Sequence, residues 1–322
     1  MGAKPQFRPN VGSELSNTRS YSTVSGLLPS GRSMEAEPAN KMIREIDESG
    51  FPLQRYCAAV LHNLGWSVLE EIPVSIPNLG NNSVTQTIET TGDIHALGRI
   101  IGRNAFNLII ECKRRQGKSW VFFRQLSKVK DDAIFLPELQ DSTRRPIQYC
   151  VSIPGNLLAP AFPICSIGWE VGLKADKEPS EKKAPKNVVR EAALQVWTAT
   201  LATLLSSKKE MIEEANLGYD DGIDHSIYIP VVVTGAEIYD ANLELENYKI
   251  GQLGGDVRKL EYAILRANIP KHLIFDLESP LPPGTDRSAL QPVDIFVVNY
   301  SAFKGFVEKL EKSLIRVSVT DF

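Results

Sequence analysis

Cysteine is scarce in this sequence, with four residues among 322, and none of them form a CxxC pair. So few and scattered cysteines exclude the disulfide framework on which small secreted domains depend. Long hydrophobic runs are also missing, since no stretch approaches about 18 consecutive apolar residues, so no membrane span is predicted. The N-terminus lacks the charged start and apolar stretch of a secretory signal. We therefore expect a cytoplasmic protein.

The charges of the chain nearly balance, with 36 Lys and Arg against 39 Asp and Glu and a net charge of −3. This balance argues against a protein that coats nucleic acid non-specifically. Hydrophobic residues make up 43% and charged residues 23% of the chain, as in soluble globular proteins. We predict a flexible tail over residues 1–45, rich in Ser, Pro, Gly and Asn. One elaborated domain is predicted over residues 46–322, with its core motif region at 50–155 and a C-terminal elaboration at 188–322.

Hydrophobic periodicity predicts alternating helices and strands along this domain. Apolar residues recur at helical spacing over residues 53–64, and two apolar runs, 93–101 and 105–113, predict strands joined by a tight turn at 102–104. The other predicted elements are a strand at 66–74, a loop at 75–91, a helix at 119–136, a strand at 147–153, a helix at 188–216, a strand at 227–234, an antiparallel partner strand at 237–243, a helix at 258–268, a strand at 294–299 and a helix at 302–314. The pattern indicates an α/β fold with a central mixed sheet flanked by helices.

Acidic and basic side chains mark the two ends of the predicted hairpin. The turn would fold Asp93, at the start of the first strand, back beside Glu111, at the end of the second. Glu111 and Lys113 are two residues apart on a strand, so their side chains project from one face. Two converging carboxylates suit Mg²⁺ or Mn²⁺, and the backbone carbonyl of Cys112 would add a further ligand. A bound ion activates water, and Lys113 would stabilise charge on a phosphate, so the pattern predicts phosphodiester hydrolysis.

A plainer interpretation of the same residues stays open. A Glu–Lys pair on a strand is commonly a solvated ion pair, and Asp93 after a glycine suits a turn. Against this, the apolar run of residues 108–110 leads directly into Glu111 and favours a buried strand.

The order of these residues resembles the PD-(D/E)xK, or restriction endonuclease-like, nuclease superfamily. The spelling GDI at residues 92–94 and LIIECKR at residues 108–114 is most similar to the Mrr-like branch. The resemblance covers about residues 50–155 and implies a restriction endonuclease-like core. By this likeness Asp93 and Glu111 are metal ligands and Lys113 is the catalytic lysine.

The same resemblance also concerns two glutamines. Several branches carry a catalytic Gln on the helix after the lysine, for which Gln125 is the candidate. Members often place a Glu on the first helix, where this chain has Gln54, and this departure leaves a second metal site open. His95, two residues after Asp93 and on the same face, is expected to be structural.

A basic stretch surrounds the predicted catalytic strand. Residues 94–130 hold nine Lys and Arg residues and a single acid, Glu111. Contact with a phosphate backbone needs such a local excess of positive charge. The residues expected to bind nucleic acid are Arg114, Arg115, Lys118 and Arg124. Three aromatic residues in this stretch could stack on bases, but their spacing favours core packing for at least two of Trp120, Phe122 and Phe123.

These observations predict an endonuclease that depends on Mg²⁺ or Mn²⁺ and cuts double-stranded DNA. The resemblance implies a role in restriction or antiphage defence, as a homodimer or as a member of a defence complex, because two strands have to be cut. Two alternatives remain open. One is a nucleic-acid-binding or scaffolding protein with the same fold and no activity, and the other is a nuclease that acts on RNA.

Overall fold

The computed structural model describes residues 36–77, 87–124, 133–140, 151–154, 163–172, 187–217, 223, 225–249, 252–270 and 290–319. The chain divides into two units, residues 1–43 and residues 44–322. Helix α1 (Ala36–Glu48) begins in the first unit and ends in the second. The last ten residues of the predicted tail, 36–45, are therefore helical, and the rest of that prediction lies outside the described residues.

The second unit is built around an eleven-stranded sheet, with strand order β1-β2-β3-β9-β13-β12-β8-β4-β10-β11 and β6 paired to β9. A separate two-stranded sheet consists of β5 and β7. The helices are α2 (Phe51–Asn63), α4 (Val188–Asn216) and α6 (Phe303–Val319), the last preceded by the 3₁₀ turn η1 (Tyr300–Ala302). The strands are β1 (Ser67–Pro77), β2 (Thr87–Ile101), β3 (Asn104–Lys113), β4 (Lys118–Arg124), β5 (Ala133–Leu136), β6 (Glu138–Gln140), β7 (Val151–Pro154), β8 (Ile164–Gly172), β9 (His225–Thr234), β10 (Glu237–Lys249), β11 (Gln252–Leu260), β12 (Tyr262–Pro270) and β13 (Leu290–Asn299).

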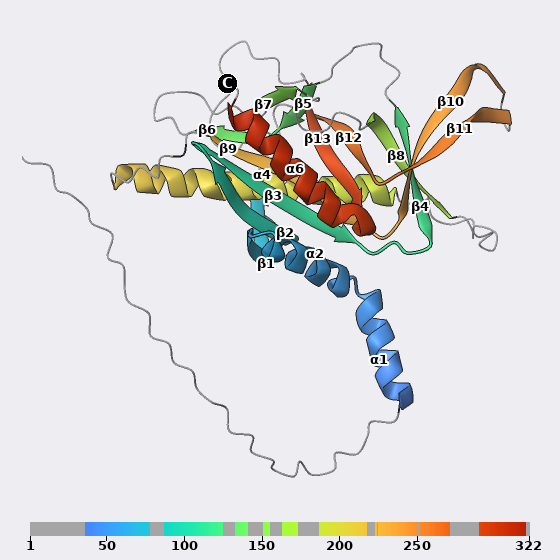
Figure 1. Ribbon diagram of the computed structural model, residues 1–322, viewed down its shortest axis with the longest axis horizontal. Helices are drawn as coiled ribbons and strands as arrows, with labels where there is room; N and C mark the ends of the chain where they lie inside the picture. Colours follow the sequence, from blue (N-terminus) through green and yellow to red (C-terminus); the bar gives the residue numbers. More distant parts are fainter. Residues whose placement is uncertain are drawn as a thin grey trace, which may run out of the picture. The chain divides into compact units, whose positions relative to one another are not determined.

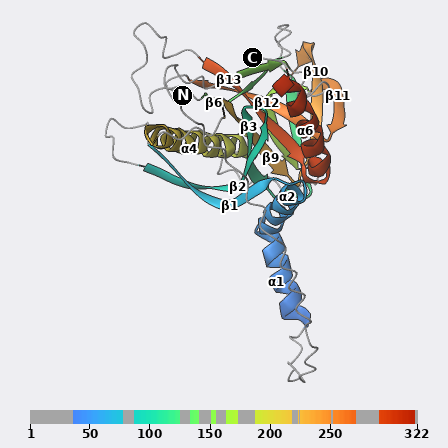
Figure 2. The ribbon, with the colours of Figure 1, turned by 60° about the vertical axis from the view of Figure 1, so that its left-hand side comes forward.

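Helices cover both faces of the large sheet (Figures 1 and 2). One face packs on α4, in a core that includes Val196 and, from the sheet, Ile109. The other face packs on α2 and α6, in a core that includes Leu61 and Phe306. This arrangement is the predicted α/β architecture with a large mixed sheet flanked by helices. None of the described helices has the length and apolar character needed to cross a membrane.

The centre of the sheet is formed by three parallel strands, β3, β9 and β13. Residues 227–234 of β9 are all buried, because helices lie against both faces of the strand at this point. A continuous apolar run is the expected sequence of such a strand. The strands predicted at 227–234 and 294–299 are confirmed, as are the helices predicted at 53–64, 188–216 and 302–314.

The helix predicted at residues 119–136 is wrong, since the chain forms β4 and β5 there. Trp120 and Phe122 point into the α4 core, while Val121 and Phe123 are only half-buried, which is the two-residue period of a strand. The same stretch pairs with β8, which the sequence analysis did not predict, and with β10. The prediction of two core aromatics among these residues is confirmed.

The helix predicted at residues 258–268 is also wrong. β11 ends at Leu260, a bend at Glu261 follows, and β12 begins at Tyr262. The two strands have different partners, because β11 pairs with β10 and β12 pairs with β13. These long-range pairings override a local sequence that is rich in helix-forming residues.

Three further predictions need smaller corrections. Residues 237–243 form a strand, but its partners are β11 and β4 instead of β9. The loop predicted at 75–91 is shorter, because β1 and β2 stay paired out to Pro77 and Thr87. The strand predicted at 147–153 appears as β7, and residues 147–150 lie outside the described part of the chain.

Candidate active site

The β2–β3 hairpin brings the two predicted acids to the same level of the sheet. A turn with Gly102 at φ +64° joins the strands, and the antiparallel register pairs Ile94 with Ile110. The next position of that register places Asp93 opposite Glu111. The carboxylate of Asp93 also accepts a hydrogen bond from the backbone N–H of Cys112, with 2.6 Å between Oδ2 and N. Two acids 18 residues apart in sequence therefore converge, as the spacing predicted.

Glu111 and Lys113 lie on one face of β3 and form an ion pair. Glu111 is only 5% exposed, whereas the side chain of Lys113 is 22% exposed. Cys112, between them, points its thiol to the opposite face, where it packs in the core that contains Cys57. The lysine thus lies on the solvent side of a buried carboxylate, where it can reach an incoming anion.

The backbone of Cys112 faces Asp93. In an extended strand the N–H and C=O of one residue point to the same side, and the N–H of Cys112 is bonded to the Asp93 carboxylate. The next residue alternates to the other side, since the carbonyl of Lys113 accepts a hydrogen bond from the N–H of Gly235 at 3.0 Å. The carbonyl oxygen of Cys112 is therefore directed to the β2 side of the strand, on which Asp93 lies.

Burial raises the pKa of both carboxylates, which favours their neutral forms. Burial and, to a lesser extent, the charge of Asp93 raise the pKa of Glu111 to about 7, although Lys113 acts in the opposite direction. Burial also raises the pKa of Asp93, against the opposing effects of the Cys112 N–H and Lys113. Neighbouring acids whose pKa values are both raised are typical of sites that hold a cation or move a proton.

A third acid that the sequence analysis missed lies beside this pair. The β1–β2 register pairs Glu70 with Ile94 and Ile72 with Gly92, so Glu71 is opposite Asp93, and its charge contributes to the raised pKa of Asp93. Glu71 has φ +52°, and it is the only non-glycine residue with positive φ in the described part of the chain. A strained backbone conformation at such a place is a common feature of functional sites. No local sequence pattern predicts that Glu71 lies near Asp93, because the register of the β1–β2 pair determines this proximity.

Gln54 and His95 are buried residues close to Asp93. The side-chain amide of Gln54, 6% exposed on α2, donates a hydrogen bond to the backbone carbonyl of Asp93 at 2.9 Å. His95 is 6% exposed, and burial lowers its pKa to about 4 although its hydrogen bond with the Asn107 side chain acts in the opposite direction. Both residues fix β2 from within the protein. Gln125 lies outside the described residues, and the helix predicted to carry it is absent around Arg124, which is the end of β4.

Most of the predicted nucleic-acid contacts have carboxylate partners. Arg115 forms a two-pronged ion pair with Glu170, and Arg124 does so with the buried carboxylate of Asp240. Arg114 pairs with Asp47, whose side chain is 54% exposed. Lys118 begins β4 and contributes to the electrostatic environment of Glu170. Of the three arginines, Arg114 therefore has the carboxylate partner most exposed to solvent. Its ion pair is the one that a phosphate would displace most readily.

The donor set fits a hard divalent cation that keeps several waters. Mg²⁺ is typically bound through one or two protein carboxylates together with waters and phosphate oxygens, and Asp93, Glu111 and the carbonyl of Cys112 are of that kind. Among the described residues there is no group of three or more His, Cys, Asp or Glu side chains that could hold a metal ion.

Comparison of the chain with protein-family models, with curated proteins and with solved structures finds no match.

Proposed function

We propose that this protein is a metal-dependent endonuclease with a restriction endonuclease-like core of the PD-(D/E)xK type, and that it hydrolyses phosphodiester bonds in DNA. The observation that carries the proposal is the convergence of Asp93 and Glu111 across a hairpin, with Lys113 paired to Glu111. Glu111 is buried, Asp93 is partly buried, and the pKa of each is raised. A structural ion pair needs one acid for one base. A second acid, which increases the cost of charging the first, has a direct use when a divalent cation is bound.

The roles follow from the positions of the side chains. Asp93, Glu111 and the Cys112 carbonyl would hold Mg²⁺ or Mn²⁺, and the ion would supply an activated water and neutralise charge on the phosphate. Lys113 donates hydrogen bonds to a phosphate oxygen or to the attacking water, and stabilises the negative charge that develops there. Gln54 keeps β2 in place through the Asp93 carbonyl. The N–H of Cys112 orients the Asp93 carboxylate.

The substrate in this proposal is double-stranded DNA, supported by the basic turn that follows the catalytic strand. Arg114 and Lys118 lie within five residues of Lys113 and would contact the phosphate backbone. By analogy with the resembled superfamily, we extend the proposal to restriction or antiphage defence by a homodimer or a defence complex, in which each copy cuts one strand.

Plasmid nicking tests the proposal. Purified protein should nick supercoiled plasmid with Mg²⁺ or Mn²⁺ and lose this activity in EDTA. Glu111→Gln and Lys113→Ala should lower the nicking rate about 100-fold or more, because each removes a group that acts on the transition state. Lys209→Ala and Glu213→Ala, in an exposed pair on α4, are matched controls and should keep the wild-type rate. Equal nicking by all four variants would show that another site, or a contaminant, does the cutting.

One alternative has its own support. Gln54 stands where a further carboxylate would be expected and uses its amide on the backbone, and the described residues assemble no third ligating side chain. These features favour a protein that binds nucleic acid without cutting it. Binding that is measurable by anisotropy, with no nicking of plasmid DNA or of labelled RNA under any divalent cation, would support that alternative.

A further inference from the structure

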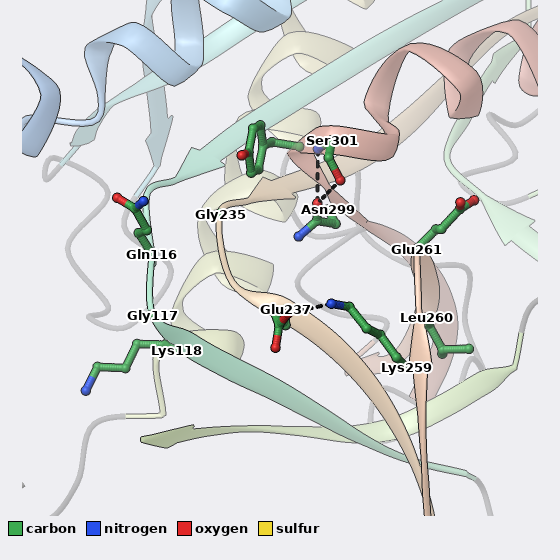
Figure 3. Close-up of a pocket in the computed structure, with 11 residues that line it drawn as sticks. Gln116, Gly117, Lys118, Gly235, Glu237, Lys259, Leu260, Glu261, Asn299 and Ser301 are labelled. Carbon is green, nitrogen blue, oxygen red and sulfur yellow. Dashed lines mark hydrogen bonds and ion pairs between the residues drawn. The ribbon is translucent and has the colours of Figure 1, made fainter. Parts of the chain in front are cut away.

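A pocket of about 720 Å³ opens beside the candidate active site (Figure 3). Its volume lies within the range of about 300–1,000 Å³ that small-molecule sites occupy. The pocket lies at the carboxyl ends of the parallel strands β9 and β13, where ligands of α/β sheets commonly bind. The lining residues that matter here are Gln116, Glu237, Lys259, Asn299, Tyr300 and Ser301.

The pocket adjoins the end of the catalytic strand. Thr234 of β9 pairs with Lys113 on one side and with Asn299 of β13 on the other. Gly235, the next residue, lines the pocket and donates its N–H to the Lys113 carbonyl. A Cβ at Gly235 would lie 3.3 Å from the backbone nitrogen of Arg115, so glycine permits this close approach. Since adjacent strands are about 4.8 Å apart, the pocket begins one strand spacing from Lys113.

The lining of the pocket contains hydrogen-bond donors, acceptors and an aromatic residue. Glu237 forms an ion pair with Lys259 (Figure 3). It also accepts a hydrogen bond from Tyr239 at 2.7 Å. The Asn299 side chain accepts from the backbone N–H and the hydroxyl of Ser301, at 3.0 and 2.6 Å. A pocket for phosphate alone would present donors and positive charge, whereas this lining also presents carboxylate and amide oxygens.

Tyr300 provides the aromatic surface. It is 47% exposed, and its ring meets Tyr56 of α2 edge-on, with 6.4 Å between the ring centroids. With this neighbour in place, about half of Tyr300 remains exposed, and the residue lines the pocket. Bases stack on such rings whatever their identity, and their edges carry both donors and acceptors.

We propose that this pocket receives one unpaired nucleobase of the substrate, stacked on Tyr300 and hydrogen-bonded by the Glu237–Lys259 pair. The inference rests on the proposed function, because it places the base beside the phosphodiester held at Asp93, Glu111 and Lys113. It adds a substrate class to that function: nucleic acid with a base out of the stack, at a bulge, a mismatch or a flipped position.

Binding of a bulged duplex tests the inference. The probe is a duplex with a single unpaired 2-aminopurine at a one-nucleotide bulge, compared with the fully paired duplex, both in EDTA so that no cleavage occurs. Wild type should bind the bulged duplex about tenfold or more tightly, and the 2-aminopurine fluorescence should fall on binding, because the base stacks on a ring. Tyr300→Ala should lose the preference and the quenching, and Tyr300→Phe should keep both.

The outcomes separate this inference from the proposed function. Equal affinity of wild type for the two duplexes, or equal weakening of both by Tyr300→Ala, overturns the pocket assignment even if the protein nicks plasmid with Mg²⁺. A bulge preference that depends on Tyr300, in a protein that fails to nick any substrate, supports the pocket and removes the nuclease assignment. Lys209→Ala is the control, because Lys209 is exposed on α4 and should leave both affinities unchanged.

Discussion

The carboxylate of Asp93 accepts a hydrogen bond from the backbone N–H of Cys112, with 2.6 Å between the two atoms. This bond joins the acid of β2 to the middle of the Glu111–Lys113 segment of β3. Asp93 therefore has two functions that can be separated, because it fixes the strand carrying the other candidate residues and also offers a charge to a cation. An amide at this position would keep the first function and lose most of the second.

We expect Asp93→Ala and Asp93→Asn to differ in stability but to agree in activity. Alanine leaves the N–H of Cys112 without an acceptor, which costs about 1–3 kcal/mol of unfolding free energy. Asparagine keeps an oxygen there and should stay close to wild type in urea denaturation. Both should lose nicking activity, because neither supplies a carboxylate. Equal destabilisation by the two substitutions would contradict the hydrogen-bonding role.

Glu111→Gln should stabilise the metal-free protein at pH 8. The raised pKa of Glu111, about 7, means that ionising this buried group in the folded protein costs free energy, and glutamine removes that cost. We expect a higher thermal midpoint for the variant than for wild type in EDTA. Added Mg²⁺ should raise the midpoint of wild type and leave that of the variant nearly unchanged, because ligand binding stabilises only the protein that binds it.

Glu111 and His95 should give opposite slopes of stability against pH. The pKa of Glu111 is raised in the folded state from 4.5 to about 7, so the folded protein binds more protons in that window and stability falls as pH rises through it. The pKa of His95 is lowered from 6.5 to about 4, so the unfolded chain binds more protons there and stability rises with pH. Each contribution is about 3 kcal/mol at about 1.36 kcal/mol per pKa unit, and the two nearly cancel between pH 4.5 and 6.5.

Single substitutions should expose each slope in metal-free urea titrations. With Glu111→Gln, the unfolding free energy should rise from pH 4 to 6.5 because the contribution of His95 remains. With His95→Asn, it should fall from pH 4.5 to 7 because the contribution of Glu111 remains. Parallel pH profiles for the two variants would show that the burial of these groups does not control their titration.

The site was predictable where it depends on short-range geometry. Asp93 and Glu111 are joined by one hairpin, and a turn at Gly102 is enough to place them opposite each other. Glu71, by contrast, reaches Asp93 through the register of a different strand pair, and Glu170 reaches Arg115 from 55 residues away. Neither contact leaves a signal in the neighbouring sequence, so both were missed.

The wrong helices have a similar cause. Residues 118–124 alternate large side chains between two faces, but Val121 and Phe122, followed four residues later by Gln125 and Leu126 respectively, also match one side of a helix. The choice between the two is made by β8 and β10, which pair with this strand from distant parts of the chain. Short apolar runs do not distinguish a strand from a buried helix by period alone. The long helix α4 was predictable because its pattern continues over many turns.

Arg114 and Arg124 should contribute unequally to DNA binding, although both were predicted to contact phosphates. Arg124 is held by a buried carboxylate, since Asp240 is 3% exposed and accepts hydrogen bonds from the guanidinium at 3.0 and 3.1 Å. Without Arg124, the buried carboxylate of Asp240 would keep only Arg258, at 3.4 Å, which would be costly, so we expect Arg124 to stay paired when DNA binds. Arg114 pairs with the exposed Asp47, and an exposed pair contributes little and exchanges readily for a phosphate.

Binding of a labelled duplex, measured by anisotropy over a range of NaCl concentrations in EDTA, distinguishes the two arginines. Arg114→Ala should reduce the slope of log affinity against log salt by about 1, as expected for one lost phosphate contact, while Arg124→Ala should leave the slope nearly unchanged. Arg124→Ala should instead lower the free energy of unfolding, because the carboxylate of Asp240 loses its closest partner. A larger loss of slope in Arg124→Ala than in Arg114→Ala would mean that Asp240 releases the arginine to DNA. The strip along β4 would then be the DNA-binding surface in place of the turn that follows Lys113.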